Sequence, residues 1–381
     1  GASSTALDGA ASQIEAVAEP RLDTAPTEGV QVPRVGLDAG LASLPDNGLG
    51  SDLGMESPGE PAAAVEGYGG AMDRITQEIL LMLDSSKVLV VWLFDQSLSL
   101  KDDQEEIKGR LDRVYQELGF RTVTDGDALL TVVASFGANS TVHTRRPTTE
   151  ITDIQKAIDE IPIDESGEEA TCKSLVEIIG SHRKYAIQGK RQLALILVTD
   201  ESGDDGEGIE PTIQTARAAN CRIYALGREA VFGYPYATLR WIDPETKLEF
   251  WRQVRRGPET PRVEQMQSNG IWRRYDAHPS GFGPYELVRL CRETGGIYFM
   301  LPSLETNLVR GEKRIYELDA MRPYLPDTRS RAEYDSDTRQ NPMRRTIGEV
   351  IETLNPVSNA GFALQQDYPV APNDFVSAAN R

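Results

Sequence analysis

An uninterrupted apolar run from Val88 to Phe94 constrains the fold of this chain more than any other feature. Its seven residues have the length of a strand and are too few for a helix that crosses a domain core. A strand that is apolar at every position is buried on both faces, which is the situation of a central strand in a parallel sheet. A second apolar run follows at 193–199. The sequence therefore predicts at least two central parallel strands.

Helix and strand patterns alternate around these two runs. Apolar residues between Ile107 and Leu118 recur at i, i+4, i+7, i+8 and i+11, which places them on one face of a helix. Alternation of this kind predicts an α/β fold with a doubly wound, mostly parallel six-stranded sheet and helices on both faces. The predicted strands are 88–94, 129–136, 141–144, 193–199, 221–226 and 296–301, of which 141–144 is expected to be a short antiparallel edge strand. The predicted helices are 107–118, 151–161, 172–186, 209–219 and 284–294, after a first helix that begins at Ala71 and ends before Ser85.

The chain divides into three regions by composition. Residues 1–69 are rich in Ala, Gly, Pro, Ser and acidic residues, so we expect a disordered linker that cannot bury enough apolar surface to order itself. Residues 70–302 hold the alternating pattern, interrupted by an insertion at 228–283 that is far longer than an ordinary connection. Residues 303–381 are a polar C-terminal extension, expected to be partly helical with a helix at 345–354.

Charge and composition narrow the possible functions. Lys and Arg number 40 against 59 Asp and Glu, a net charge of −19, so nucleic acid is not an expected partner. The three cysteines and three histidines have no zinc-like spacing, and HExxH, CxxC and GxSxG motifs are absent, so histidine-based hydrolysis is not expected. The cysteines are expected to be buried core residues, and one disulfide pair stays open as an alternative. The sequence has no apolar run of membrane-spanning length.

A polar motif follows the first central strand directly. Asp95, Ser97 and Ser99 stand at alternate positions of Asp-Gln-Ser-Leu-Ser. A carboxylate and two hydroxyls in such a loop can converge on one hard cation, and the carboxyl ends of parallel strands are where such folds bind ligands. The motif resembles the DxSxS sequence of von Willebrand factor A and integrin I domains, where this loop holds a divalent ion at the metal-ion-dependent adhesion site. A loop that only caps the next helix is the simpler alternative.

Two further segments extend the resemblance, which covers about residues 70–302 without the insertion. The segment 195–200 resembles the strand of that family that ends in LVTDG and supplies Asp200, with Glu201 where glycine is common. The stretch 167–175 resembles GGTxTxxAL and places Glu169 at the threonine ligand position and Thr171 at the second threonine. The resemblance implies a Rossmann-like fold and one divalent ion, Mg²⁺ or else Mn²⁺ or Ca²⁺. Its protein ligands would be Asp95, Ser97, Ser99, Glu169 or Thr171, and Asp200.

A glutamate at position 169, where the family has a threonine, would change the charge around the bound ion. A site built from neutral hydroxyls leaves the cation electron-poor, so that it attracts an acidic side chain from a protein partner. A direct Glu169 ligand would raise the affinity for the metal and lower the affinity for an acidic partner. Alternatively Glu169 turns away, and Thr171 or water takes its place.

The insertion is the second candidate binding region. It contains Trp241, Trp251 and Trp272 and a series of arginines that includes Arg255 and Arg256, residue types that are enriched in protein interfaces. Because the insertion follows the carboxyl end of a parallel strand, it can reach the predicted metal site. The alternative is that the tryptophans form a small satellite core and the arginines balance the acidic body.

The resemblance to von Willebrand factor A domains implies a protein-binding module of the adhesion or scaffold kind that is not an enzyme. One alternative is a metal-independent scaffold with a degenerate site. Another is a Mg²⁺-dependent phosphotransferase of the haloacid dehalogenase kind, although Ser97 stands where those enzymes carry a second aspartate. The acidic run 200–207 is expected to be a solvated loop rather than a second cation site. The low-complexity start, with Gly1 as the first residue, favours a membrane-tethered or secreted bacterial protein whose anchor or leader precedes the chain, and a cytoplasmic location stays open.

Overall fold

A computed structural model describes residues 63–65, 67–121, 126–164, 166–242, 246–265, 279–301 and 325–359. Most of the predicted linker at 1–69 lies outside these ranges, as does Trp272, so the expected disorder of the linker stays a prediction. The cores, the candidate site and the C-terminal helices described below all lie within these ranges.

One mostly parallel sheet organises the domain. Its strand order is β1-β9-β6-β5-β2-β3-β4, with β2 (Lys87–Asp95) at its centre between β3 (Leu129–Phe136) and β5 (Arg191–Val198). Every residue of β2 after Lys87 is buried, which confirms the reading of its apolar run. The other strands are β1 (Ala63–Ala64), β4 (Ser140–Val142), β6 (Cys221–Gly227) and β9 (Tyr298–Met300).

The six predicted strands are confirmed, and the sheet has one more. β4 pairs antiparallel with β3 at one edge, as predicted. At the other edge β1 pairs parallel with β9, inside the segment that we assigned to the linker. A strand of two residues has no periodicity that a sequence reading can detect, so the linker prediction is wrong at this point.

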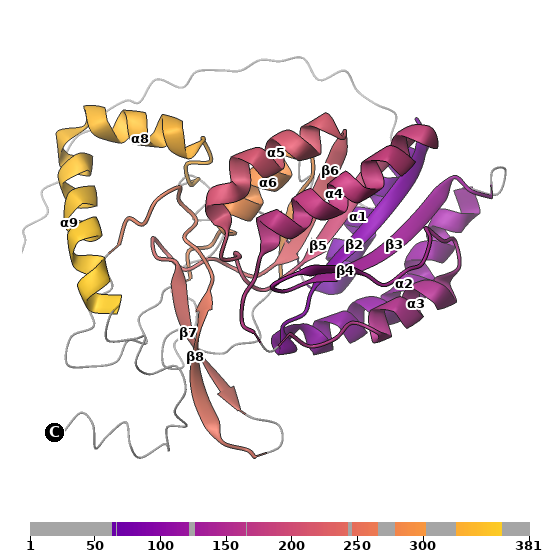
Figure 1. Cartoon of the computed structure of the whole chain (residues 1–381), viewed down its shortest axis with the longest axis horizontal. Coiled ribbons are helices and arrows are strands. Elements are labelled where there is room, and N and C mark those ends of the chain that lie inside the picture. Colours follow the sequence, from indigo (N-terminus) through magenta and orange to yellow (C-terminus); the bar gives the residue numbers. More distant parts are fainter. Residues whose placement is uncertain are drawn as a thin grey trace, which may run out of the picture. The chain divides into compact units, whose positions relative to one another are not determined.

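Helices cover both faces of the sheet (Figure 1). On one face α1, α2 and α3 pack against Val88, Val90, Trp92 and Phe94, and on the other face α4, α5 and α6 pack against Leu89, Val91 and Leu93. The alternation along β2 therefore serves two separate cores, as expected for a central strand. The helices are α1 (Tyr68–Leu83), α2 (Lys101–Arg121), α3 (Ile151–Asp159), α4 (Thr171–Gln188), α5 (Ile209–Ala218) and α6 (Tyr285–Thr294).

The three cysteines are core residues. Cys172, Cys221 and Cys291 are buried with free thiols, which confirms the first expectation and excludes the disulfide alternative. Burial raises the pKa of each thiol, so none of the three is a reactive thiolate at neutral pH.

The insertion folds around a two-stranded sheet of its own. β7 (Tyr236–Ile242) pairs antiparallel with β8 (Glu249–Arg255), and the register places Trp241 opposite Phe250 and Arg240 opposite Trp251. A small core of Val231, Tyr234 and Ala237 lies at the base of this hairpin. A satellite core therefore exists, although its described members are not tryptophans.

The C-terminal extension contributes two helices, α8 (Arg331–Gln340) and α9 (Pro342–Asn359), and the predicted helix at 345–354 lies within α9. A capping box between Ser330 and Glu333 starts α8. No described helix has the length and apolar character that a membrane crossing requires.

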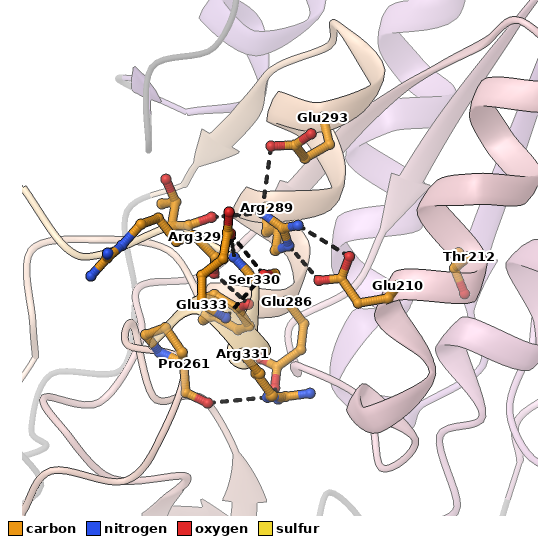
Figure 2. Close-up of polar contacts among 12 residues, drawn as sticks. Glu210, Thr212, Pro261, Glu286, Arg289, Glu293, Arg329, Ser330, Arg331 and Glu333 are labelled. Carbon is orange, nitrogen blue, oxygen red and sulfur yellow. Dashed lines mark hydrogen bonds and ion pairs between the residues drawn. The ribbon is translucent and has the colours of Figure 1, made fainter. Parts of the chain in front are cut away.

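Ion pairs and hydrogen bonds attach α8 and the residues just before it to the α/β domain (Figure 2). Arg289 of α6 donates to both carboxylate oxygens of Glu210, at 2.7 and 3.1 Å, and to the carbonyl oxygen of Thr328 at 2.8 Å. Arg331 pairs with the buried Glu286 and donates to the carbonyl oxygens of Gly206 at 2.7 Å and Pro261 at 3.1 Å. Arg331 thus joins α6, the loop before α5 and the insertion.

Candidate metal centre

The parallel register of β2 and β5 brings two polar strand ends together. Phe94 stands opposite Val198, so Asp95 and Thr199 leave the sheet side by side. Asp95 is buried, and its Oδ2 accepts a hydrogen bond from the Thr199 hydroxyl at 2.8 Å. Its Oδ1 accepts one from the backbone N–H of Ser97 at 2.8 Å, which fixes the loop around the carboxylate.

The two serine hydroxyls connect Asp95's loop to Asp200. The hydroxyls of Ser97 and Ser99 lie 3.1 Å apart, and Ser99 Oγ donates to Asp200 Oδ1 at 3.3 Å. Asp95, Ser97, Ser99 and Asp200, predicted from separate segments, therefore lie in one cluster. We did not identify Thr199 as a member, although its place between β5 and Asp200 was a usable signal.

The second loop brings two more oxygen atoms to the N-terminus of α4. Within the described structure, Glu169 Oε2 and Thr171 Oγ1 are buried and have no hydrogen-bond partner. The backbone of Glu169 is held by Asp204, whose Oδ2 accepts from Glu169 N at 3.0 Å and whose N–H donates to Glu169 O at 2.9 Å. Unpaired buried oxygen atoms are costly, and a bound cation is one group that satisfies them.

Buried carboxylates repel one another at this edge. Burial first, and then the charge of Asp200, raise the pKa of Asp95 to about 7. The same two causes raise the pKa of Glu201 to about 8. Burial and then the charge of Asp95 hold the pKa of Glu169 well above its usual value. The cluster therefore has an excess of negative charge that protons or a cation must offset.

We expect metal-free protein to lose stability as the pH rises from about 4 to about 8. Because the folded pKa values of Asp95 and Glu201, about 7 and about 8, lie above the unfolded values, the folded state holds more protons in this window. Folded protein is therefore favoured at low pH, and this advantage is lost as the pH passes the folded pKa values. Urea unfolding in chelator at several pH values measures it. Asp95→Asn should show a shallower pH dependence, and identical slopes in both proteins would contradict the assignment.

The residues fit a hard divalent cation. Among the described residues, no group of three or more His, Cys, Asp or Glu side chains is placed to hold a metal, so an ion here would also need hydroxyl ligands. Asp95 and Asp200 supply carboxylates, Ser97 and Ser99 supply hydroxyls, and this all-oxygen donor set suits Mg²⁺ better than a soft metal. The unpaired oxygen atoms in the second loop are consistent with an ion at this place.

The insertion contacts the same cluster of side chains at the carboxyl edge of the sheet. Arg256 Nη2 lies 3.4 Å from Asp200 Oδ2, and both side chains are buried. Arg255 N donates to Glu201 Oε2 at 3.0 Å, and its carbonyl oxygen accepts from Ser202 N at 2.8 Å. We grouped Arg255 and Arg256 as partner-binding residues; the structure separates them, because only Arg255 is partly exposed.

The contacts of the insertion do not test the prediction that its three tryptophans bind a partner. Trp241 and Trp251 lie in β7 and β8, but their side chains lie outside the described part of the structure, as does all of Trp272. Their role in partner binding stays a prediction.

A second ion pair that we did not predict lies beside the cluster around Asp95. Arg228, the first residue of the insertion, pairs with the mostly buried Asp103 of α2 at 2.7 Å. Gln104 Nε2 of the same helix donates to the carbonyl oxygen of Asp95 at 2.9 Å. Helix α2 therefore contacts the end of β2 through Gln104 and the insertion through Asp103. No local sequence pattern indicates either contact.

Residues 90–243 match the family model of the von Willebrand factor type A domain. No curated protein matches the chain. Among solved structures, BatB from Bacteroides thetaiotaomicron is 16% identical with a TM-score of 0.35, covering 57% of this chain and 91% of that one. An aerotolerance-related membrane protein from Bacteroides fragilis is 12% identical with a TM-score of 0.35, covering 57% and 92%. The SpRpn10 VWA domain is 11% identical with a TM-score of 0.30, covering 37% and 74%.

Proposed function

We propose, for a chain whose residues 90–243 form a von Willebrand factor type A domain, that it is a protein-binding module with a divalent cation at the carboxyl edge of its sheet. Domains of this family generally take part in protein–protein interactions and are typically not enzymes. The cluster of oxygen atoms around Asp95 supports the further proposal that binding by this chain depends on a cation.

The observation that supports the proposal is the cluster of oxygen atoms that Asp95, Ser97 and Ser99 form with Asp200 at the ends of β2 and β5. Asp95 and Asp200 would set the charge of the site and orient water, while Ser97 and Ser99 would ligate the ion. Glu169 or Thr171, each with an unpaired buried oxygen, would complete the protein ligands. The remaining position would be open to a partner side chain, and an acidic one is the natural ligand of an exposed divalent ion.

A metal-independent scaffold is the second candidate, and one contact favours it. Arg256 already supplies a positive charge to Asp200, so part of the negative charge is offset without any metal. The phosphotransferase alternative gains no comparable support, since Ser97 and not an acid stands two residues after Asp95.

Chelator-sensitive capture tests the proposal. The immobilised full chain is expected to retain partner proteins in Mg²⁺ and to release them in chelator, and Asp95→Ala should retain none of them. Asp102→Ala is the matched control, because this acid is exposed at the start of α2 and outside the cluster. Retention of the same proteins in Mg²⁺, in chelator and by Asp95→Ala would overturn the cation-dependent function and favour the scaffold.

A further inference from the structure

We propose that Arg256 is a built-in competitor of the divalent cation for Asp200, so that cation binding loosens the attachment of the insertion to the metal centre. This inference rests on the proposed cation site and adds a regulatory partner from within the chain. The insertion places the guanidinium group of Arg256 beside Asp200, the side chain that the cation also needs.

The backbone at Arg256 is fixed by the base of the insertion. Arg256 N donates to the carbonyl oxygen of Pro235 at 2.8 Å, and the Arg256 carbonyl oxygen accepts from Val231 N at 3.0 Å. The next residue, Gly257, packs so closely that a Cβ atom would lie 2.9 Å from the carbonyl oxygen of Val231. Val231 belongs to the small core at the base of the hairpin. The guanidinium therefore reaches Asp200 from a rigid support.

Asp200 has two oxygen atoms, and both have partners. Oδ1 accepts from the Ser99 hydroxyl at 3.3 Å, and Oδ2 faces Arg256 Nη2 at 3.4 Å. A divalent ion held by Asp200, directly or through water, draws on the same carboxylate charge. Because the ion and the guanidinium are both positive and meet in a buried region of low dielectric, each weakens the binding of the other.

The same short loop holds the insertion to the sheet. Besides the Arg256–Asp200 pair, Arg255 N donates to Glu201 Oε2 at 3.0 Å and Ser202 N donates to the Arg255 carbonyl oxygen at 2.8 Å. The loop residues involved are consecutive, so a shift of the Asp200 carboxylate toward a cation acts directly on these contacts. By thermodynamic linkage, the free energy by which a bound cation weakens the insertion contact equals the free energy by which that contact weakens cation binding.

If Arg256 positioned Asp200 instead of competing for it, removing Arg256 would change the affinity for the cation in the opposite direction. If Arg256 only orients Asp200 for ligation, its removal weakens cation binding. If Arg256 competes, its removal leaves Asp200 as a buried, unpaired carboxylate that attracts the cation more strongly. A binding measurement therefore separates a competitor from a positioning residue.

The test is calorimetric titration of the chelator-stripped full chain with Mg²⁺ and Mn²⁺. Arg256→Met is expected to lower the Kd for the ion at least tenfold relative to the wild type. Arg255→Met is the matched control, since it removes the same charge from the adjacent residue, whose side chain is 27% exposed and lies 4.0 Å from Asp204. Its Kd should stay within about threefold of wild type, because a partly exposed charge is screened by solvent. An Arg256→Met Kd equal to or weaker than wild type would overturn the proposal.

Hydrogen–deuterium exchange of the unmodified chain gives a second readout that needs no variant to fold. Added Mn²⁺ is expected to speed exchange of the amides of residues 231 and 255–257, while the amides of β2 stay protected. Unchanged or slower exchange there would overturn the competition. If neither wild type nor Arg256→Met binds an ion, the proposed cation site itself fails. If both bind with equal affinity, the site stands and only the competition fails.

Discussion

Replacing Arg331 with methionine should lower the free energy of unfolding by about 3–5 kcal/mol, the usual cost of removing one partner from a buried ion pair. Glu286 is buried, and burial raises the pKa of its carboxyl group while Arg331 opposes that rise. Without the guanidinium, Glu286 must either stay charged in the core or take up a proton. The carbonyl oxygens of Gly206 and Pro261 would lose a donor as well.

Urea unfolding measures this loss, and two variants control it. Arg329→Met removes a guanidinium two residues earlier whose pairs with Asp327 and Asp337 are partly exposed and screened by solvent, so it should cost far less than Arg331→Met. Combining Arg331→Met with Glu286→Gln should restore much of the loss, because no buried charge is then left without a partner. A cost for Arg331→Met as small as that of Arg329→Met would show that the C-terminal extension is not held by this pair.

The sheet and its helices were predictable because local patterns encode them. The apolar runs in β2 and β5 predicted central strands, and the helix predicted at 284–294 is observed as α6, which Gly295 ends in the left-handed conformation at φ 75°. The ends of strands were predicted less accurately: the strand predicted at 296–301 is observed at Tyr298–Met300. Pairing geometry, which the sequence does not display, decides such ends.

The closeness of Asp95 and Asp200 was predictable for a related reason. Neighbouring parallel strands end at the same edge of a sheet, so Asp95 and Asp200 had to be close once β2 and β5 were neighbours. The choice between Glu169 and Thr171 was not predictable, because it depends on side-chain orientation and on the ion. The Arg256–Asp200 pair was also hidden, since it depends on how a long insertion packs back on the domain.

The second large effect expected is stabilisation by a cation. An ion that binds only the folded state adds RT ln(1 + [L]/Kd), about 2.7 kcal/mol at a hundredfold excess over Kd. Asp95 is the buried centre of the cluster, with Ser97 N and Thr199 Oγ1 on its two oxygen atoms. Its removal should therefore abolish the response, even where the variant is otherwise folded.

Thermal unfolding of chelator-stripped protein, with and without millimolar Mg²⁺, Mn²⁺ or Ca²⁺, tests the central claim most directly. Each variant is compared with its own metal-free midpoint, so that a change in intrinsic stability does not enter. We predict a rise in the midpoint for the wild type and for the exposed-acid control Asp102→Ala, and no rise for Asp95→Ala. An equal rise in Asp95→Ala, or no rise in any of the three proteins, would contradict a cation site at this edge of the sheet.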